Sequence, residues 1–145
     1  MRVEGSILLP VEPQAAWDAL LRWEEQARWM KDADSVRVLT SKRQGAGTRI
    51  AVRTRVWNVP LFTEELEVVL WEPPWRLVMA HRSFVRGVGT WVLSPEGAGT
   101  RFTWTEELSL PAPPLGELAL LVYRPFMRRL IRGALSDLRA VLALE

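Results

Sequence analysis

Residues 111–145 read PAPPLGELALLVYRPFMRRLIRGALSDLRAVLALE, and this stretch decides the fold because it predicts one long amphipathic helix. Projected at about 100° per residue, most apolar side chains from Phe126 onward share one arc and the arginines share the other. The apolar arc contains Phe126, Met127, Leu130, Ile131, Ala134, Leu138, Val141 and Leu142. Pro125 lacks an amide hydrogen, so we expect a kink between an upper segment, 115–123, and a lower segment, 126–143. Such a helix needs an apolar surface to lie on.

Alternating segments earlier in the chain predict that surface. Each has apolar residues at every second position, which is typical of strands with one buried face. Breakers that contain proline or glycine separate most of them, which favours an antiparallel meander. Two short helices are predicted between the first and second strands, one from about Pro13 and one over about 24–30. The predicted strands are 3–9, 35–42, 48–57, 62–71, 76–83, 87–93 and 100–108.

Charges set the predicted pairing of strands 48–57 and 62–71. Placing Arg55 opposite Glu65 and Arg53 opposite Glu67 gives a charged outer ladder and leaves the apolar residues together on the inner face. The pentapeptide Gly-Ala-Gly-Thr-Arg occurs at 45–49 and again at 97–101. Neither copy leads into a predicted helix, so we interpret both as hairpin turns and not as phosphate-binding loops.

Composition excludes several classes of function. The chain has 145 residues, which predicts a single domain over 1–145. Its 19 basic and 17 acidic residues are spread along the chain, which argues against a nucleic-acid interface. There is no cysteine and only one histidine, His81, so we expect no disulfide, no metal and no other cofactor.

The same composition bears on location and source. No apolar run reaches membrane-spanning length and the first residues do not form a signal peptide, so we expect a cytoplasmic protein. Arginine dominates over lysine and Asn58 is the only asparagine, which hints at a thermophilic source.

Several motifs along the chain carry a family resemblance: 6–20, Trp29 with 34–39, 45–48, 97–100, 89–93 and 103–105. In this order and spacing they resemble the START-like or SRPBCC superfamily, often labelled polyketide cyclase/dehydrase. The resemblance covers nearly the whole chain. It implies an α+β helix-grip fold, in which a seven-stranded antiparallel sheet curls around the C-terminal helix and leaves a cavity. It also implies a hydrophobic ligand such as a lipid, sterol, quinone, polyketide or plant hormone, and in some members a cyclase or dehydratase activity.

Three ionisable side chains share the inward parity: Glu64, His81 and Glu106. If Leu66 lies opposite His81, Glu64 falls close enough to form an acid/base pair with the imidazole. The alternatives are that the pair holds the polar end of a ligand or is structural. Glu106 has a further interpretation, a place at the frayed end of the sheet where it reaches water.

Aromatic residues complete the predicted site. Trp91 and Trp104 share the inward parity and are candidates for a cavity wall, although aromatic core filling explains them equally simply. Tyr123 is predicted to place its hydroxyl at the cavity mouth or to fill the core with a wet tip. The predicted ligand contacts are Val52, Thr54, Leu66, Val68, Met79, His81, Trp91, Trp104, Glu106, Tyr123, Met127 and Leu130.

Three functions are compatible with these patterns. The first is binding or transport of a small hydrophobic ligand between sheet and helix. The second is a cyclase or dehydratase that uses His81 and Glu64 as acid and base. The third is a protein-interaction module whose partner meets the arginine face of the helix. Two other interpretations of that face are peripheral contact with anionic lipid headgroups and simple exposure to solvent. It contains Arg124, Arg128, Arg129 and Arg132.

Overall fold

The structure is a computed structural model that describes residues 1–56, 58–112 and 114–144. Trp57, at the end of a predicted strand, and Pro113 and Glu145, in the helical stretch, lie outside the described residues. The elements are β1 (Arg2–Leu9), α1 (Pro13–Leu20), the 3-10 helix η1 (Trp23–Arg28), β2 (Ala33–Val38), β3 (Arg49–Val56), β4 (Val59–Glu72), β5 (Arg76–Arg82), β6 (Arg86–Glu96), β7 (Gly99–Ser109) and α2 (Leu115–Ala143).

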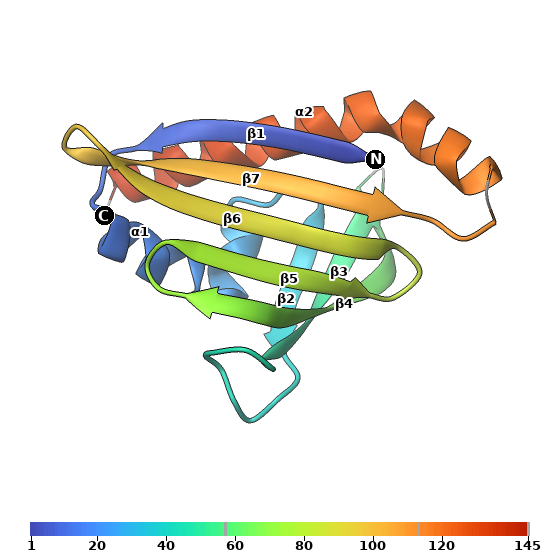
Figure 1. The fold of residues 1–145 in the computed structure, drawn as a ribbon, viewed down its shortest axis with the longest axis horizontal. Helices are drawn as coiled ribbons and strands as arrows, with labels where there is room; N and C mark the ends of the chain where they lie inside the picture. The colour runs from blue at the N-terminus through green and yellow to red at the C-terminus, as the bar shows by residue number, and fades with distance from the viewer. Residues whose placement is uncertain (57, 113, 145) are drawn as a thin grey trace.

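The strands form one antiparallel sheet in the order β1-β7-β6-β5-β4-β3-β2. The N-terminal strand therefore joins the last strand, while the other strands follow one another as a meander. The sheet curls and α2 runs along β1 and β7 (Figure 1), while α1 contacts β6 and β7. This arrangement confirms the predicted helix-grip α+β fold with short helices between the first two strands.

A glycine lets the helix approach the sheet closely. A Cβ at Gly5 of β1 would lie 2.8 Å from Cγ2 of Ile131 and 3.0 Å from Cδ1 of Leu135, both on α2. Real Cβ atoms do not approach neighbours this closely, so the contact depends on the missing side chain. Ile131, Leu135, Leu138 and Leu142 are all buried, so the C-terminal half of α2 is packed against the rest of the protein.

The predicted pairing of β3 with β4 is wrong by four residues. Arg49 lies opposite Glu67, and its guanidinium is 2.7 Å from the carboxylate of Glu65. Arg53 lies opposite Thr63, and Arg55 instead reaches Asp34 of β2 at 2.8 Å. The cause is that β4 begins at Val59 and not near 62, so the hairpin turn is tighter than predicted. An even shift preserves side-chain parity, so the inner face keeps the predicted residues.

Helix α2 continues through Pro125, so the two predicted segments form one element. Phe126 was predicted to be buried but is 48% exposed. The N-terminal turns of α2 extend past the start of β1 in Figure 1 and so have less sheet to cover them. As a result, Leu118, Leu121 and Val122 are also exposed. In the part of the chain that the structure describes, no helix is long and apolar enough to cross a membrane.

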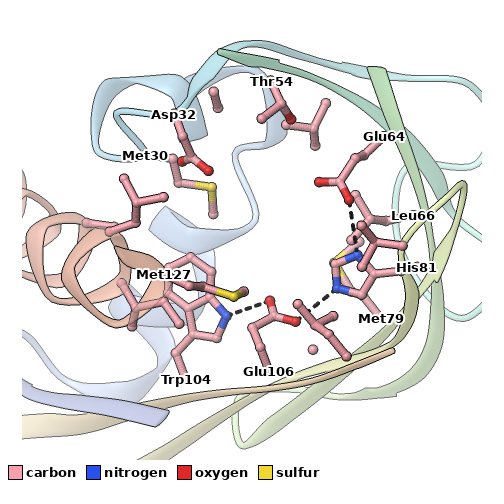
Figure 2. Close-up of a pocket in the computed structure, with 18 of the residues that line it drawn as sticks. Met30, Asp32, Thr54, Glu64, Leu66, Met79, His81, Trp104, Glu106 and Met127 are labelled. Atoms are coloured by element: carbon pink, nitrogen blue, oxygen red, sulfur yellow. Dashed lines mark hydrogen bonds and ion pairs between the residues drawn. The ribbon is translucent and has the colours of Figure 1, made fainter. Parts of the chain in front are cut away.

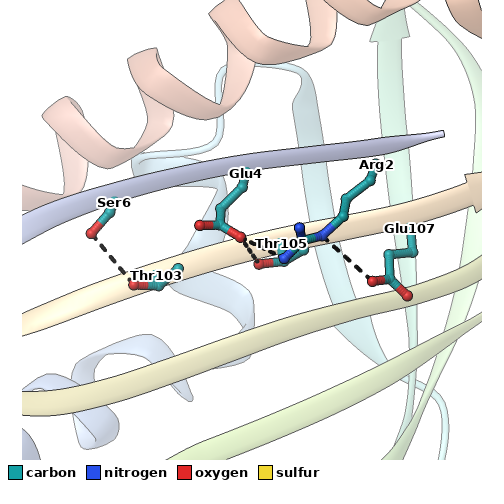
Figure 3. Close-up of polar contacts among 6 residues, drawn as sticks. All are labelled: Arg2, Glu4, Ser6, Thr103, Thr105 and Glu107. Carbon is teal, nitrogen blue, oxygen red and sulfur yellow. Dashed lines mark hydrogen bonds and ion pairs between the residues drawn. The ribbon is translucent and has the colours of Figure 1, made fainter.

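The outer face of the sheet is polar where β1 meets β7. Arg2 is 2.9 Å from Glu4 and 3.6 Å from Glu107, and the Thr105 hydroxyl donates to Glu4 at 3.1 Å (Figure 3). Since successive residues of a strand point to opposite faces, Glu107 faces outward and its neighbour Glu106 faces the helix. Glu106 lies in mid-strand, opposite Val3 of β1, and not at a frayed end.

Candidate functional site

A cavity of about 490 Å³ lies between the inner face of the sheet and α2. Most of its wall is apolar, with Trp91 of β6 and Trp104 of β7 forming an aromatic portion. Their ring centroids are 5.9 Å apart, and both rings contact Trp29, which follows η1. The space is large enough for a small organic ligand, and an apolar wall with a few polar groups is typical of ligand pockets.

The structure brings together nearly all the predicted ligand contacts. Val68 is the exception, because it is fully buried in the packed core opposite Met79 and is not among the described residues that line the cavity. The other predicted residues line the cavity: Val52, Thr54, Leu66, Met79, His81, Trp91, Trp104, Glu106, Tyr123, Met127 and Leu130. Glu64, the proposed partner of His81, also lies in the wall.

The polar centre of the cavity is His81, held between two carboxylates (Figure 2). Leu66 lies opposite His81 as predicted, and Oε1 of Glu64 is 3.7 Å from the Nδ1 atom of His81. Glu106 is nearer: its Oε2 atom is 2.9 Å from Nε2 of His81, and its Oε1 accepts a hydrogen bond from Nε1 of Trp104 at 2.9 Å. His81 is 8% exposed and Glu106 is 6% exposed. The interpretation that Glu106 reaches water at the frayed end of the sheet is therefore wrong, because its carboxylate is buried against His81.

The contact between His81 and Glu106 spans a strand. His81 belongs to β5 and Glu106 to β7. Because β6 lies between these two strands, their backbones are roughly 10 Å apart. Opposite Glu106, β6 carries Gly89, where a Cβ would lie 2.8 Å from Oε1 and 3.0 Å from Oε2 of Glu106. The glycine thus leaves the room in which the carboxylate reaches across β6 to the imidazole.

These carboxylates decide the charge of His81. Burial disfavours the imidazolium, but the hydrogen bond to Glu106 and the nearby carboxylate of Glu64 outweigh burial and raise the pKa of His81 to about 9. At neutral pH the ring is therefore protonated, and Nε2 donates to Glu106. The Nδ1 atom is buried and has no hydrogen-bond partner among the described residues, and Oε1 of Glu64 lies 3.7 Å from it.

Sequence reasoning missed one acidic member of the site, Asp32. It follows η1 and lines the cavity across from His81 (Figure 2). Burial, together with the charges of Glu64 and Glu106, raises the pKa of the Asp32 carboxyl. Because Asp32 lies in a turn before β2, strand parity gave no indication of its direction. Phe62 and Phe84, both partly exposed, also line the cavity and were not predicted.

On α2, Tyr123 lines the cavity and is 43% exposed, which agrees with a position at the mouth. Burial raises the pKa of its hydroxyl, with smaller contributions from the charges of Asp32 and Glu64. The arginine face is less uniform than predicted: Arg129 and Arg132 are exposed, whereas Arg124 and Arg128 are half-buried.

The family model described as polyketide cyclase / dehydrase and lipid transport matches residues 1–143 of this chain. No curated protein matches this chain in sequence.

Solved structures share its fold. TTHA0849 from Thermus thermophilus is 23% identical, with a TM-score of 0.78 over 99% of this chain and 98% of that one. The Zhui aromatase/cyclase from Streptomyces sp. R1128 is 13% identical, with a TM-score of 0.82 over 99% and 93%. The di-domain ARO/CYC StfQ of the steffimycin biosynthetic pathway is 14% identical, with a TM-score of 0.73 over 96% of this chain and 49% of that one.

Proposed function

The chain belongs to the polyketide cyclase/dehydrase and lipid transport family, and from this premise we propose that it binds a small hydrophobic molecule in the cavity between its sheet and α2. The observation that carries the proposal is the cavity itself, which has a volume of about 490 Å³ and a mostly apolar wall. Burial of apolar ligand surface there would supply roughly 25 cal/mol per Å² before ordering costs.

Polar groups support a fixed orientation of the ligand. His81 and Glu64 line the space on one wall, and Thr54 and Asp32 line it on another. A ligand whose polar end meets these groups would place its apolar part against Trp91 and neighbouring side chains. This division is what a carrier needs in order to select one lipophile among many.

Native mass spectrometry of gently purified protein tests the proposal, with tryptophan fluorescence titration as the second measurement. The expected results are a co-purified lipophile and saturable quenching by members of a panel of quinones, sterols, fatty acids and aromatic amines. Val52→Trp should block the cavity and abolish the quenching, whereas Arg53→Trp, on the outer face of the same strand, should not. Absence of both a bound mass and any saturable quenching would contradict the proposal.

The geometry around His81 favours acid–base catalysis as a second candidate. A protonated Nδ1 is placed to polarise a ligand carbonyl, and Glu64 beside it is placed to accept a proton from an adjacent carbon. These are the roles that an aldol cyclisation or a dehydration requires, and the aromatase/cyclase neighbours make that reaction class the natural one to test.

Deuterium exchange at the enolisable carbon of 1-phenylbutane-1,3-dione gives a direct readout. Catalysed exchange is expected with the natural protein, and it should fall by roughly a hundredfold in Glu64→Gln, the low end for loss of general-base catalysis. Glu65→Gln, on the outer face of β4, is the matched control. If exchange stays at the buffer rate while the dione binds, the protein is a carrier for this class of compound and not a catalyst.

A further inference from the structure

We propose that the cavity takes a lipophile that carries a protonated amine, and that the ammonium group lies between Asp32 and Glu64. This inference rests on the proposed function, because it names the class of ligand for the same cavity. The family premise does not supply it. It follows from the balance of hydrogen-bond acceptors and donors in the wall.

Acidic groups exceed basic groups in that wall. Three carboxyl groups line the cavity, from Asp32, Glu64 and Glu106, and the only basic side chain among the described lining residues is that of His81. Glu106 has both oxygens engaged, one by His81 and one by Trp104. One imidazolium thus serves two carboxylates, Glu106 closely and Glu64 at 3.7 Å, and the carboxyl of Asp32 is in excess of it.

Asp32 and Glu64 are the two groups that are less closely paired. The Asp32 carboxyl has no ion pair among the described residues, and the carboxylate of Glu64 has only the 3.7 Å approach to His81, which is too long for a hydrogen bond. They face the open space from opposite walls, with Thr54 between them (Figure 2). The pKa of Asp32 is raised because burial and the neighbouring charges both oppose its ionised form. Ionising this carboxyl group without a cation nearby therefore costs free energy.

An ammonium group would relieve that cost, whereas an anionic group would increase it. A cation between the two carboxyl groups is attracted by both, and it can donate a charge-assisted hydrogen bond to the one that it contacts. A ligand carboxylate would meet two carboxyl groups with no Arg or Lys among the described lining residues. Its one attractive partner would be Nδ1 of His81, which is buried and has no partner of its own.

The apolar part of the ligand has a defined place. Trp104 and Met127 lie on the side of α2, away from Glu64 (Figure 2), and the ring of Trp91 contacts that of Trp104. A flat ring system or a short alkyl chain fits against these side chains while its amine reaches the carboxyl groups. The proposed ligand is therefore a compact lipophilic amine and not a fatty acid.

Three probes that differ only in the polar group test this: 2-(aminomethyl)naphthalene, 2-(hydroxymethyl)naphthalene and 2-naphthoate, titrated at pH 7 by isothermal calorimetry. The amine should bind roughly tenfold or more tightly than the alcohol, since one opposite charge in a partly buried site contributes at least that factor. The naphthoate should bind most weakly. Equal or tighter binding of the naphthoate would overturn the inference and leave the proposed function standing.

Variants locate the effect. Glu64→Gln and Asp32→Asn should each lower the ratio of amine affinity to alcohol affinity by about tenfold. Glu65→Gln and Asp34→Asn, which change neighbouring acidic residues on the outer face, should leave the ratio unchanged. Equal loss of both ligands in Glu64→Gln and Asp32→Asn would also refute the inference. If none of the three probes and no lipophile of the wider panel binds, the proposed function itself fails, and the inference fails with it.

Discussion

Replacing Glu106 by Gln is expected to lower the pKa of His81 by about one to two units. In the natural protein the Oε2 atom of Glu106 accepts a hydrogen bond from His81 at 2.9 Å in a buried setting. Hydrogen bonds to charged groups contribute about 1.5–3 kcal/mol, and one pKa unit corresponds to about 1.36 kcal/mol. From a starting value of about 9, the variant should titrate between about pH 7 and 8. The glutamine amide also offers a donor to Nε2, which favours the neutral ring.

The assay is an NMR titration of the imidazole proton resonances between pH 5 and 10. His81 is the only histidine in the chain, so its signals need no assignment. The matched control is Glu107→Gln, which removes a carboxylate from the next position of β7 on the outer face. A natural protein that titrates at pH 6.5 or below would refute the electrostatic account of the site. So would a Glu106→Gln protein whose titration matches that of the control.

Two further predictions follow from burial. The folded-state pKa of His81 lies above its ordinary value of 6.5, so the protonated ring stabilises the folded protein. This stabilisation is complete below about pH 6.5 and is lost as the pH rises through about 9. The loss is at most about 3 kcal/mol. Denaturation by urea at pH 6 and pH 10 should show this loss in the natural protein and a smaller loss in His81→Gln. The raised pKa values of Asp32 and Tyr123 contribute equally in the two proteins. An equal loss in both would contradict the prediction. Leu138→Ala, at a site 1% exposed, should lower the free energy of unfolding by about 2–5 kcal/mol. Leu144→Ala, 88% exposed, should change it by less than about 0.5 kcal/mol, and similar values for the two would argue against the helix packing.

The fold was predictable because its signals are local. Alternation along each strand depends on residues two positions apart, and the face of α2 depends on residues three and four apart. The register of β3 with β4 was not predictable in the same way, since it depends on how many residues the connection between the two strands takes up. The charge pattern suggested Arg55 with Glu65, but a shift of four residues gives Arg49 the same partner. Several registers satisfy the charges, and the turn selects among them.

The candidate site divides along the same line. His81 and Glu64 were found because each lies on an alternating strand, and the pairing of Leu66 with His81 places them together. The contact with Glu106 joins strands that are not neighbours, and it depends on the space left by Gly89 of the strand between them. Asp32 lies on no strand, and its direction depends on the turn after η1. Reach across the sheet and turn geometry are tertiary properties that alternation does not encode.

The pairing of β1 with β7 has a consequence for synthesis on the ribosome. Arg2 lies opposite Glu107, so the first strand has no partner until nearly the whole sheet has been translated. The meander from β2 to β6 closes through short connections and is able to pair as it emerges. The N-terminal strand must wait with its apolar side chains uncovered, and α2, which is translated after β7, is the element that finally covers it. Synthesis of α2, after the last strand of the sheet, is therefore the step that completes the cavity.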